Sequence, residues 1–176
     1  MKLISFFLMI TALFIIMQPS TFAAKKCDAK IAEEYVNKAC AIVNANPDPK
    51  VFIPKVEALT FCDGNYVWVQ TRKKDTYQIV AHRVSPALKK KKEWLPKVMS
   101  KLKLFELLND AGLDSSGKKW VAYKWKSKDD LLNATKKLSL LKKCNNDWAA
   151  GSGIWLKNCA GCPKIDYGKK YIVEKK

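Results

Sequence analysis

The side chains best suited to chemistry in this sequence are one histidine and two short runs of alternating aromatic residues. His82 is the only histidine. Its ring is either a hydrogen-bond donor or cation that faces an anion, or a half-buried residue bonded to a carbonyl. Tyr123 and Trp125 alternate onto one face of their strand, and Tyr66 and Trp68 do the same. Each aromatic pair therefore either walls a pocket or packs in a core, and the residues alone leave both interpretations open.

Six cysteines form the second group with chemical potential. They are Cys27, Cys40, Cys62, Cys144, Cys159 and Cys162. An even number of cysteines in an exported chain predicts disulfide bonds, and six allow many pairings, so the pairing stays open. Cys27 and Cys40 are excluded as partners if they share one helix, because they would lie about 20 Å apart along it. Cys159 and Cys162 form a CxxC pair, for which a structural disulfide is the main interpretation and redox exchange the lesser one.

The sequence contains none of the common catalytic motifs. It has no GxSxG, no HExxH, no phosphate loop and no convincing pair of carboxylates. A single histidine does not make a typical zinc site without cysteines, and cysteines of an exported protein are expected to be oxidised. We therefore expect a binding protein rather than an enzyme, with no cofactor and no bound metal ion.

Residues 1–23 have the pattern of a secretory signal peptide. Lys2 gives a short positive start, residues 3–17 are apolar, and small residues ending at Ala23 precede a cleavage site. The alternative is an uncleaved membrane anchor, but the apolar run is shorter than the about 20 residues that span a bilayer. We predict cleavage after Ala23, no later transmembrane segment, and a periplasmic or secreted location.

The mature chain has the size of one domain, predicted over residues 24–156 and followed by a basic, cysteine-containing tail over 157–176. The full chain carries a formal net charge of +17, which attracts anions. Only Arg72 and Arg83 are arginines, whereas readout of nucleic acid prefers arginine to lysine. We expect no nucleic-acid partner, a largely solvated lysine surface, and at most a contact with an envelope polyanion or partner protein.

Hydrophobic spacing predicts an α+β fold. Residues 28–45 have helical spacing with Asp28 as the N-cap, and a Pro-Asp-Pro run ends the helix. Residues 50–59 and the lysine-rich segment 87–103 are predicted as further helices, with 104–111 as one or two more helical turns. Strands are predicted at residues 66–69, 77–84, 119–125, 137–142 and 148–156. These elements give a five-stranded antiparallel sheet with the long N-terminal helix packed on one face.

Five blocks of the sequence resemble, in order, motifs of the single-Cache domains that serve as extracytoplasmic sensor modules of bacterial receptors. The blocks are NYVWV (65–69), VAHRVSP (80–86), WVAYKW (120–125), KLS (137–139) and DWAAGSGIW (147–155). They are similar to the family's first sheet strand, its AHPxxP strand end, its GWVxYxW strand, the start of its KxSYV strand and its DWVVGxGIY closing strand. The resemblance covers residues 28–156.

The resemblance implies a PAS-like sheet behind the long helix, with a pocket for a small organic molecule, often a short carboxylate. It implies that Lys137 pairs with a ligand carboxylate and that His82 faces the anion. The predicted ligand-binding residues are His82, Tyr123, Trp125, Lys137, Tyr66 and Trp68. Arg83 stands where the family usually has proline, and a regular strand would point its side chain away from that of His82. In the family the module usually feeds a kinase or chemotaxis domain, whereas here we expect a free-standing exported protein.

Three hypotheses for the function follow. The leading one is an exported sensor-type protein that binds a small anionic metabolite in a Cache-type pocket. The second is a secreted basic protein that binds a polyanion or partner protein through residues 89–92 and the tail, with strong salt dependence. The third is a thiol–disulfide oxidoreductase that depends on Cys159.

Overall fold

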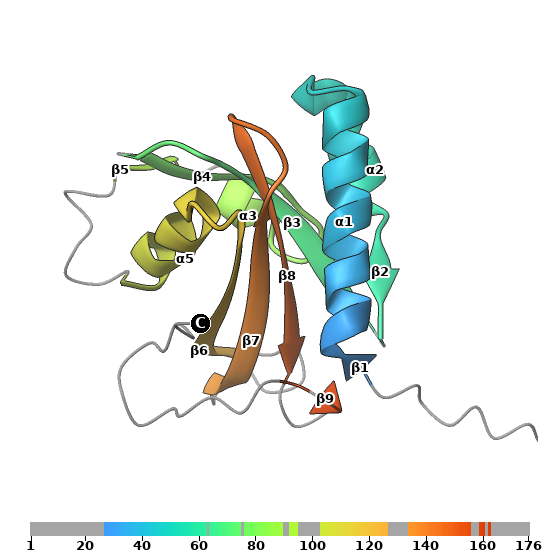
Figure 1. Cartoon of the computed structure of the whole chain (residues 1–176), viewed down its shortest axis with the longest axis vertical. Coiled ribbons are helices and arrows are strands. Elements are labelled where there is room, and N and C mark those ends of the chain that lie inside the picture. The colour runs from blue at the N-terminus through green and yellow to red at the C-terminus, as the bar shows by residue number, and fades with distance from the viewer. Residues whose placement is uncertain are drawn as a thin grey trace, which may run out of the picture.

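The computed structural model describes residues 27–62, 64–74, 76–89, 92–94, 103–126, 134–155, 159–160 and 162 (Figure 1). The elements, in chain order, are β1 (Cys27–Asp28), α1 (Ala29–Ala45), α2 (Pro49–Glu57), β2 (Thr60–Phe61), β3 (Asn65–Thr71), β4 (Thr76–His82), α3 (Pro86–Lys89), β5 (Lys92–Trp94), α5 (Lys103–Leu113), β6 (Lys118–Lys126), β7 (Ala134–Lys143), β8 (Trp148–Trp155) and β9 (Cys159–Ala160). The predicted signal peptide and nearly all of the predicted tail lie outside the described residues. Among the helices described, none has the length and apolar character needed to cross a membrane.

The strands form one antiparallel sheet in the order β5-β4-β3-β8-β7-β6, with β2 pairing beside the start of β3. All five predicted strands are present, as β3, β4, β6, β7 and β8. The described sheet nevertheless has seven strands rather than five. The two additional strands, β2 and β5, are short segments that satisfy backbone groups near the sheet edge, and such pairing leaves no hydrophobic pattern in the sequence. A separate parallel pair joins β1 to β9.

The helix predicted over residues 87–103 is wrong in part. Only Pro86–Lys89 forms a helix, α3, whereas Lys92–Trp94 is the strand β5 and pairs with the outer edge of β4. The unpaired backbone groups at the edge of β4 form hydrogen bonds with this segment. These bonds outweigh the helical spacing of its apolar residues. Residues 95–102 lie outside the described part of the chain. The helical turns predicted at 104–111 are the longer helix α5.

The long N-terminal helix α1 forms as predicted and lies along one face of the sheet (Figure 1). Asp28 is its N-cap, and the carboxylate accepts a hydrogen bond of 2.8 Å from the backbone N–H of Ile31. The buried side of the helix repeats at helical spacing. Its members are Ala32, Val36, Ala39, Cys40 and Val43. These residues pack on the inner residues of the central strands, so α1 covers that face.

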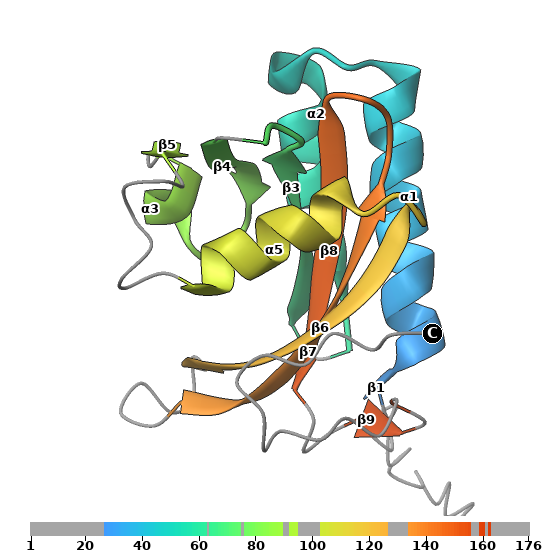
Figure 2. The same cartoon turned by 60° about the vertical axis from the view of Figure 1, so that its left-hand side comes forward.

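The two faces of the sheet belong to two different cores. The core under α1 and α2 takes Val67 and Val69 from β3 and Leu140 from β7. The core on the opposite face takes the residues that alternate with these, such as Trp68 and Leu141, and is covered by α5 (Figure 2). The alternation along β3 and β7 therefore assigns Tyr66, Trp68 and Lys137 to the face opposite α1.

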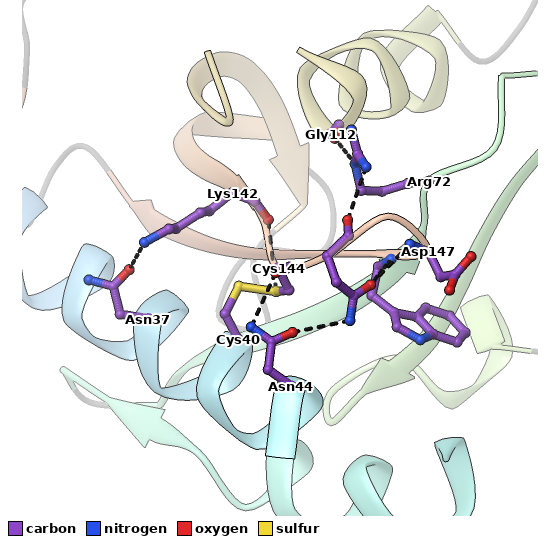
Figure 3. The surroundings of a disulfide bond; sticks show 10 residues. Asn37, Cys40, Asn44, Arg72, Gly112, Lys142, Cys144 and Asp147 are labelled. Atoms are coloured by element: carbon purple, nitrogen blue, oxygen red, sulfur yellow. Dashed lines mark hydrogen bonds between the residues drawn. A yellow bond between two sulfur atoms is a disulfide. The ribbon is translucent and has the colours of Figure 1, made fainter. Parts of the chain in front are cut away.

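Three disulfide bonds are present, Cys27–Cys62, Cys40–Cys144 and Cys159–Cys162. The prediction of disulfides is confirmed, as is the exclusion of a bond between Cys27 and Cys40. The bond from Cys40 joins α1 to the turn between β7 and β8, where Asn44 also donates a hydrogen bond of 3.1 Å to the Cys144 carbonyl oxygen (Figure 3). The α1 side of the molecule is therefore held by covalent bonds as well as by packing.

Arg72 fastens the end of α5 to the same turn. Its Nε donates a hydrogen bond of 2.8 Å to the Gly112 carbonyl oxygen, and its Nη1 donates one of 3.0 Å to the Asn145 carbonyl oxygen (Figure 3). One turn earlier, the Gln70 side chain donates to the carbonyl oxygen of Leu108 at 3.1 Å. The second half of α5 is thus anchored to the sheet by side chains of β3 and of the residue that follows it.

Candidate functional site: a cavity opposite α1

A small cavity lies on the face of the sheet opposite α1, under α3 and α5. Five of the six predicted site residues line it: Tyr66, Trp68, His82, Tyr123 and Lys137. The rest of the wall is largely apolar and comes from Leu88 of α3, from Leu104, Phe105 and Leu108 of α5, and from Tyr77 and Ile79 of β4. The cavity volume is about 20 Å³, which accommodates about one water-sized group.

The sixth predicted residue, Trp125, lies in β6 two positions after Tyr123. Its side chain is outside the described part of the structure, so its role in the cavity stays a prediction. Arg83 does not line the cavity; its guanidinium group donates a hydrogen bond of 3.2 Å to the Glu57 carbonyl oxygen at the surface. The structure therefore brings five predicted residues together and places Arg83 outside.

Lys137 is the central charged group of the cavity. Its side chain is almost completely buried, with 2% relative exposure. The Nζ atom donates a hydrogen bond of 3.2 Å to the Tyr66 hydroxyl, and it lies 4.8 Å from the Tyr66 ring centre and 4.9 Å from that of Trp155. Within the described residues no carboxylate forms an ion pair with it. Burial without a counter-charge lowers the pKa of Lys137 to about 7.

Two glycines of β8 make the space in which the polar and aromatic side chains lie. A Cβ atom at Gly153 would collide with the Cε atom of Lys137 and would come within 2.8 Å of the Ser139 hydroxyl. A Cβ atom at Gly151 would collide with the indole of Trp68. Gly151 and Gly153 therefore leave the room that the Trp68 and Lys137 side chains occupy, which explains why both positions are glycine.

A β-bulge turns His82 toward the cavity. In the pairing of β3 with β4, Ala81 is opposite Val69 and Ile79 is opposite Gln70, so Val80 has no partner. Such an extra residue changes the alternation of side chains along a strand. As a result Ile79 and His82, three positions apart, both line the cavity. In a regular strand they would point to opposite faces.

The imidazole of His82 is a neutral hydrogen-bond donor rather than a cation. Its Nδ1 accepts a hydrogen bond of 2.9 Å from the backbone N–H of Ser85, so the neutral ring carries its proton on Nε2. Burial, followed by the charge of Lys137, lowers the pKa of His82 to about 4. The neutral ring can donate a hydrogen bond from Nε2, and the cationic form is disfavoured.

The end of β4 at His82 is held in place by Glu57 of α2. The Oε1 atom of Glu57 accepts a hydrogen bond of 2.9 Å from the His82 backbone N–H and one of 2.7 Å from Lys89 Nζ. Lys89 is the last residue of α3, which covers the cavity. One carboxylate therefore links α2, the end of β4 and α3.

The hydroxyl groups of the cavity differ in their hydrogen bonding. Tyr123 OH is hydrogen-bonded to the Ser139 hydroxyl at 2.9 Å, and Tyr66 OH accepts from Lys137. Burial raises the pKa of Tyr123 well above its usual value and that of Tyr66 to about 12, so both remain protonated.

Tyr77 also lines the cavity but was missed in the sequence analysis. Its only signal in the sequence is that it alternates with Ile79 on the cavity face of β4.

Comparison with known proteins identifies the fold. No family model matches the sequence, and no curated protein matches it. A solved structure titled "Structural basis for carboxylic acid recognition by a Cache chemosensory domain" matches with a TM-score of 0.56 and 18% identity, over 72% of this chain and 92% of that chain. The chain has a Cache-type fold. The single-Cache resemblance seen in the sequence is therefore confirmed at the level of the fold, as is the α+β, PAS-like architecture.

Two further solved structures also match this chain. One is a periplasmic sensor domain of a chemotaxis protein, with a TM-score of 0.51 and 19% identity over 72% of this chain and 89% of that chain. The other is a methyl-accepting chemotaxis protein from Vibrio parahaemolyticus, with a TM-score of 0.56 and 16% identity over 72% of this chain and 87% of that chain. At these identities the likeness concerns the Cache fold, and the function must be argued from the cavity itself.

Proposed function

We propose that the protein is an extracytoplasmic sensor-type domain whose cavity binds a small organic anion, most simply a short carboxylate. The observation that carries the proposal is Lys137, a buried ammonium group at a cavity with no acidic partner among the described residues. A carboxylate in the cavity would supply the missing counter-charge. The Cache fold supports the proposal, since one neighbour is described as recognising carboxylic acids.

Burying an unpaired charge is costly, and it is tolerated where a ligand or a change of protonation compensates for it. In the proposed complex, Lys137 Nζ binds one carboxylate oxygen with a charge-assisted hydrogen bond. The Nε2–H group of His82 and the hydroxyl of Tyr66 are the neutral donors available to the second oxygen. The wall formed by Trp68 and by the leucines of α3 and α5 receives the carbon chain of the ligand.

The cavity must enlarge to admit such a ligand, because about 20 Å³ is less than a carboxylate of two to four carbons occupies. The second half of α5 is tied to the sheet through Gln70 and Arg72. The first half of α5, which carries Leu104 and Phe105, has no such polar tie among the described contacts. We therefore infer that ligand entry displaces the first half of α5 or α3, and that this displacement is the primary response to binding.

The proposal is tested by thermal denaturation of the mature protein with acetate, propionate, amino acids and polyanions, at low and high salt. A ligand that binds only the folded state raises the melting temperature. The test variant is Lys137→Met. The matched control is Lys142→Met on the same strand, because Lys142 Nζ bonds to Asn37 of α1 on the other side of the molecule (Figure 3).

We expect a small carboxylate to raise the melting temperature of the wild type and of Lys142→Met, with the rise persisting at high salt. In Lys137→Met the rise should disappear, while the free variant melts at or above the wild-type temperature because an unpaired buried charge has been removed. Equal carboxylate binding by Lys137→Met and the wild type would refute the site. Stabilisation by polyanions alone, abolished by salt, would favour the basic-surface hypothesis instead.

The cellular setting belongs to the same proposal. The pattern of residues 1–23 supports export to the periplasm or outside the cell, and the Cache-type neighbours include a periplasmic sensor domain. The net charge of +17 supports a contact between the lysine-rich surface and an envelope polyanion or partner protein.

The CxxC hypothesis is tested separately by an insulin-reduction assay. If thiol–disulfide exchange is the function, the Cys159→Ser variant should lose this activity.

A further inference from the structure

The cavity contains a buried hydroxyl that has no hydrogen-bond partner among the described residues. Tyr77 is buried, with 2% relative exposure, and its hydroxyl has no hydrogen-bond partner in the described part of the structure. Leaving a hydroxyl buried and unpaired costs free energy, so native proteins keep such groups rarely and mostly for a reason. Two other buried side-chain atoms share this property, on Thr71 and Asn109, but of the three residues Tyr77 alone lines the cavity.

The ring of Tyr77 is fixed by the fold, while its hydroxyl is left available. The ring stacks on Phe105 of α5, with centres 5.1 Å apart and planes at 29°. Burial, followed by the nearby Tyr123 and Tyr66, raises the pKa of Tyr77 well above its usual value, so the hydroxyl stays protonated. A neutral phenol group both donates and accepts hydrogen bonds.

The other polar groups of the cavity already have partners or an assigned role. Tyr123 OH is bonded to Ser139, Tyr66 OH to Lys137, and the Nδ1 of His82 to the backbone of Ser85. In the proposed complex the carboxylate of the ligand accepts hydrogen bonds from Lys137 and from the donors beside it. The Tyr77 hydroxyl reaches the same cavity from β4, which β3 and β8 separate from β7, the strand of Lys137.

We propose that Tyr77 is a specificity-determining residue, and that its hydroxyl bonds to a second polar group of the ligand, a hydroxyl or keto oxygen. The cavity would then select short hydroxy or oxo acids over plain fatty acids of the same length. The inference rests on the proposed carboxylate function and adds the class of acid. When one ligand forms a hydrogen bond with a buried polar group and an analogue leaves that group unpaired, the site binds the analogue much more weakly.

The experiment measures dissociation constants by calorimetry for four acids of the same carbon number: propionate, lactate, 3-hydroxypropionate and pyruvate. The variants are Tyr77→Phe, which deletes only the hydroxyl, and Tyr35→Phe as a matched control. Tyr35 lies on α1, where it stacks on Phe61, and is not among the residues that line the cavity. We expect the wild type and the control to bind at least one of the substituted acids about ten-fold or more tightly than propionate. In Tyr77→Phe that preference should shrink to within about two-fold, with propionate affinity unchanged or improved.

A second measurement separates recognition from a structural role. If the Tyr77 hydroxyl is unpaired in the free protein, Tyr77→Phe should melt at or above the wild-type temperature. A clear loss of stability in Tyr77→Phe would show that the hydroxyl has a structural partner and would overturn the proposal. So would a wild type that binds propionate as tightly as the three substituted acids, a result that leaves the carboxylate function intact. If none of the four acids binds, both the function and this inference fail.

Discussion

The two faces of the sheet are built from different kinds of residues. The face under α1 is apolar and closely packed, with Val67, Val69 and Leu140 completely buried, and two disulfide bonds hold its periphery. The opposite face buries an ammonium group at Lys137, a neutral imidazole at His82 and an unpaired hydroxyl. Polar groups of this kind reduce stability, and the apolar face compensates for them. The face under α1 therefore provides the free energy of folding. This stability allows the opposite face to keep polar groups suited to binding a ligand.

The strongest test of this division removes the covalent tie on the α1 side. Cys40 and Cys144 are 104 residues apart in the sequence, so their bond restricts the unfolded chain greatly. Replacing both with alanine should lower the free energy of unfolding by about 4–5 kcal/mol on the chain-entropy model. Denaturant unfolding under oxidising conditions measures the loss. Carboxylate affinity should change by less than about two-fold, because the cavity lies on the other face.

A matched control for that experiment is the pair Cys159→Ala, Cys162→Ala. These cysteines are only three residues apart in the sequence, so the same model gives a loss of about 2 kcal/mol or less. If both double variants lost the same free energy of unfolding, the long-range Cys40–Cys144 bond would not be the main covalent contribution to the stability of the α1 side. If the Cys40, Cys144 variant lost ligand binding while still folded, the two faces would not be independent.

The second test uses neighbouring positions of β8 that face opposite ways. Gly153→Ala places a Cβ atom against Lys137 and Ser139, and we expect carboxylate affinity to fall by about 100-fold, or about 2.7 kcal/mol. Ser152→Ala removes only a hydrogen bond of 3.3 Å to the Ala32 carbonyl oxygen on the α1 side. It should lower stability by about 1 kcal/mol and leave affinity unchanged. Calorimetry and denaturant unfolding of both variants would expose any reversal of these effects.

The third test is the pH dependence of binding, which only the cavity face should show. The pKa of Lys137 is about 7 in the free protein, and a bound carboxylate raises it by favouring the charged form. Affinity should therefore change little just below pH 6 and fall by up to ten-fold per pH unit above about pH 7. His82, with a pKa near 4, and Tyr66, with a pKa near 12, keep one protonation state through this range.

Calorimetry at pH 8 in buffers of different ionisation enthalpy should also detect proton uptake on binding. An affinity that stays constant from pH 6 to pH 9 would mean that Lys137 is either always charged in the free protein or not the ligand's partner. Lys137→Met should show no pH dependence in whatever weak binding remains.

The sequence predicted the residues whose role follows from local pattern, and it missed those whose role depends on tertiary contacts. Alternation along β3 placed Tyr66 and Trp68 correctly on one face, whereas Lys137 was predicted from the resemblance to a family strand motif. The same alternation would have pointed His82 away from Ile79, because a bulge cannot be recognised from hydrophobic spacing. Residues 92–94, which form β5, were predicted as part of a helix. Pairing with the edge of β4 depends on backbone hydrogen bonds, which leave no hydrophobic pattern in the sequence. Tyr77 stood out only once its hydroxyl was seen to be buried without a partner.

The smallest effect is expected at Glu57, which links α2 on one face to the end of β4 and to α3 on the other. Burial alone raises the pKa of Glu57, but the hydrogen bonds from Lys89 and His82 outweigh it, so the pKa lies below the usual 4.5. Glu57→Gln removes the charge of a partly exposed ion pair, and we expect a loss of less than about 1 kcal/mol at pH 7.

Because the folded-state pKa of Glu57 is lowered, its contribution is present above about pH 4.5 and is lost as the pH falls through the folded value. The difference in unfolding free energy between the wild type and Glu57→Gln should therefore shrink as the pH falls below 4.5 and vanish once the pH is below the folded-state pKa. If Glu57 only anchors α3, carboxylate affinity at pH 6 should change by less than about three-fold. A larger loss of affinity would mean that α3 is part of the recognition of the ligand, and that the boundary between the stable face and the binding face runs through α2 rather than through the sheet.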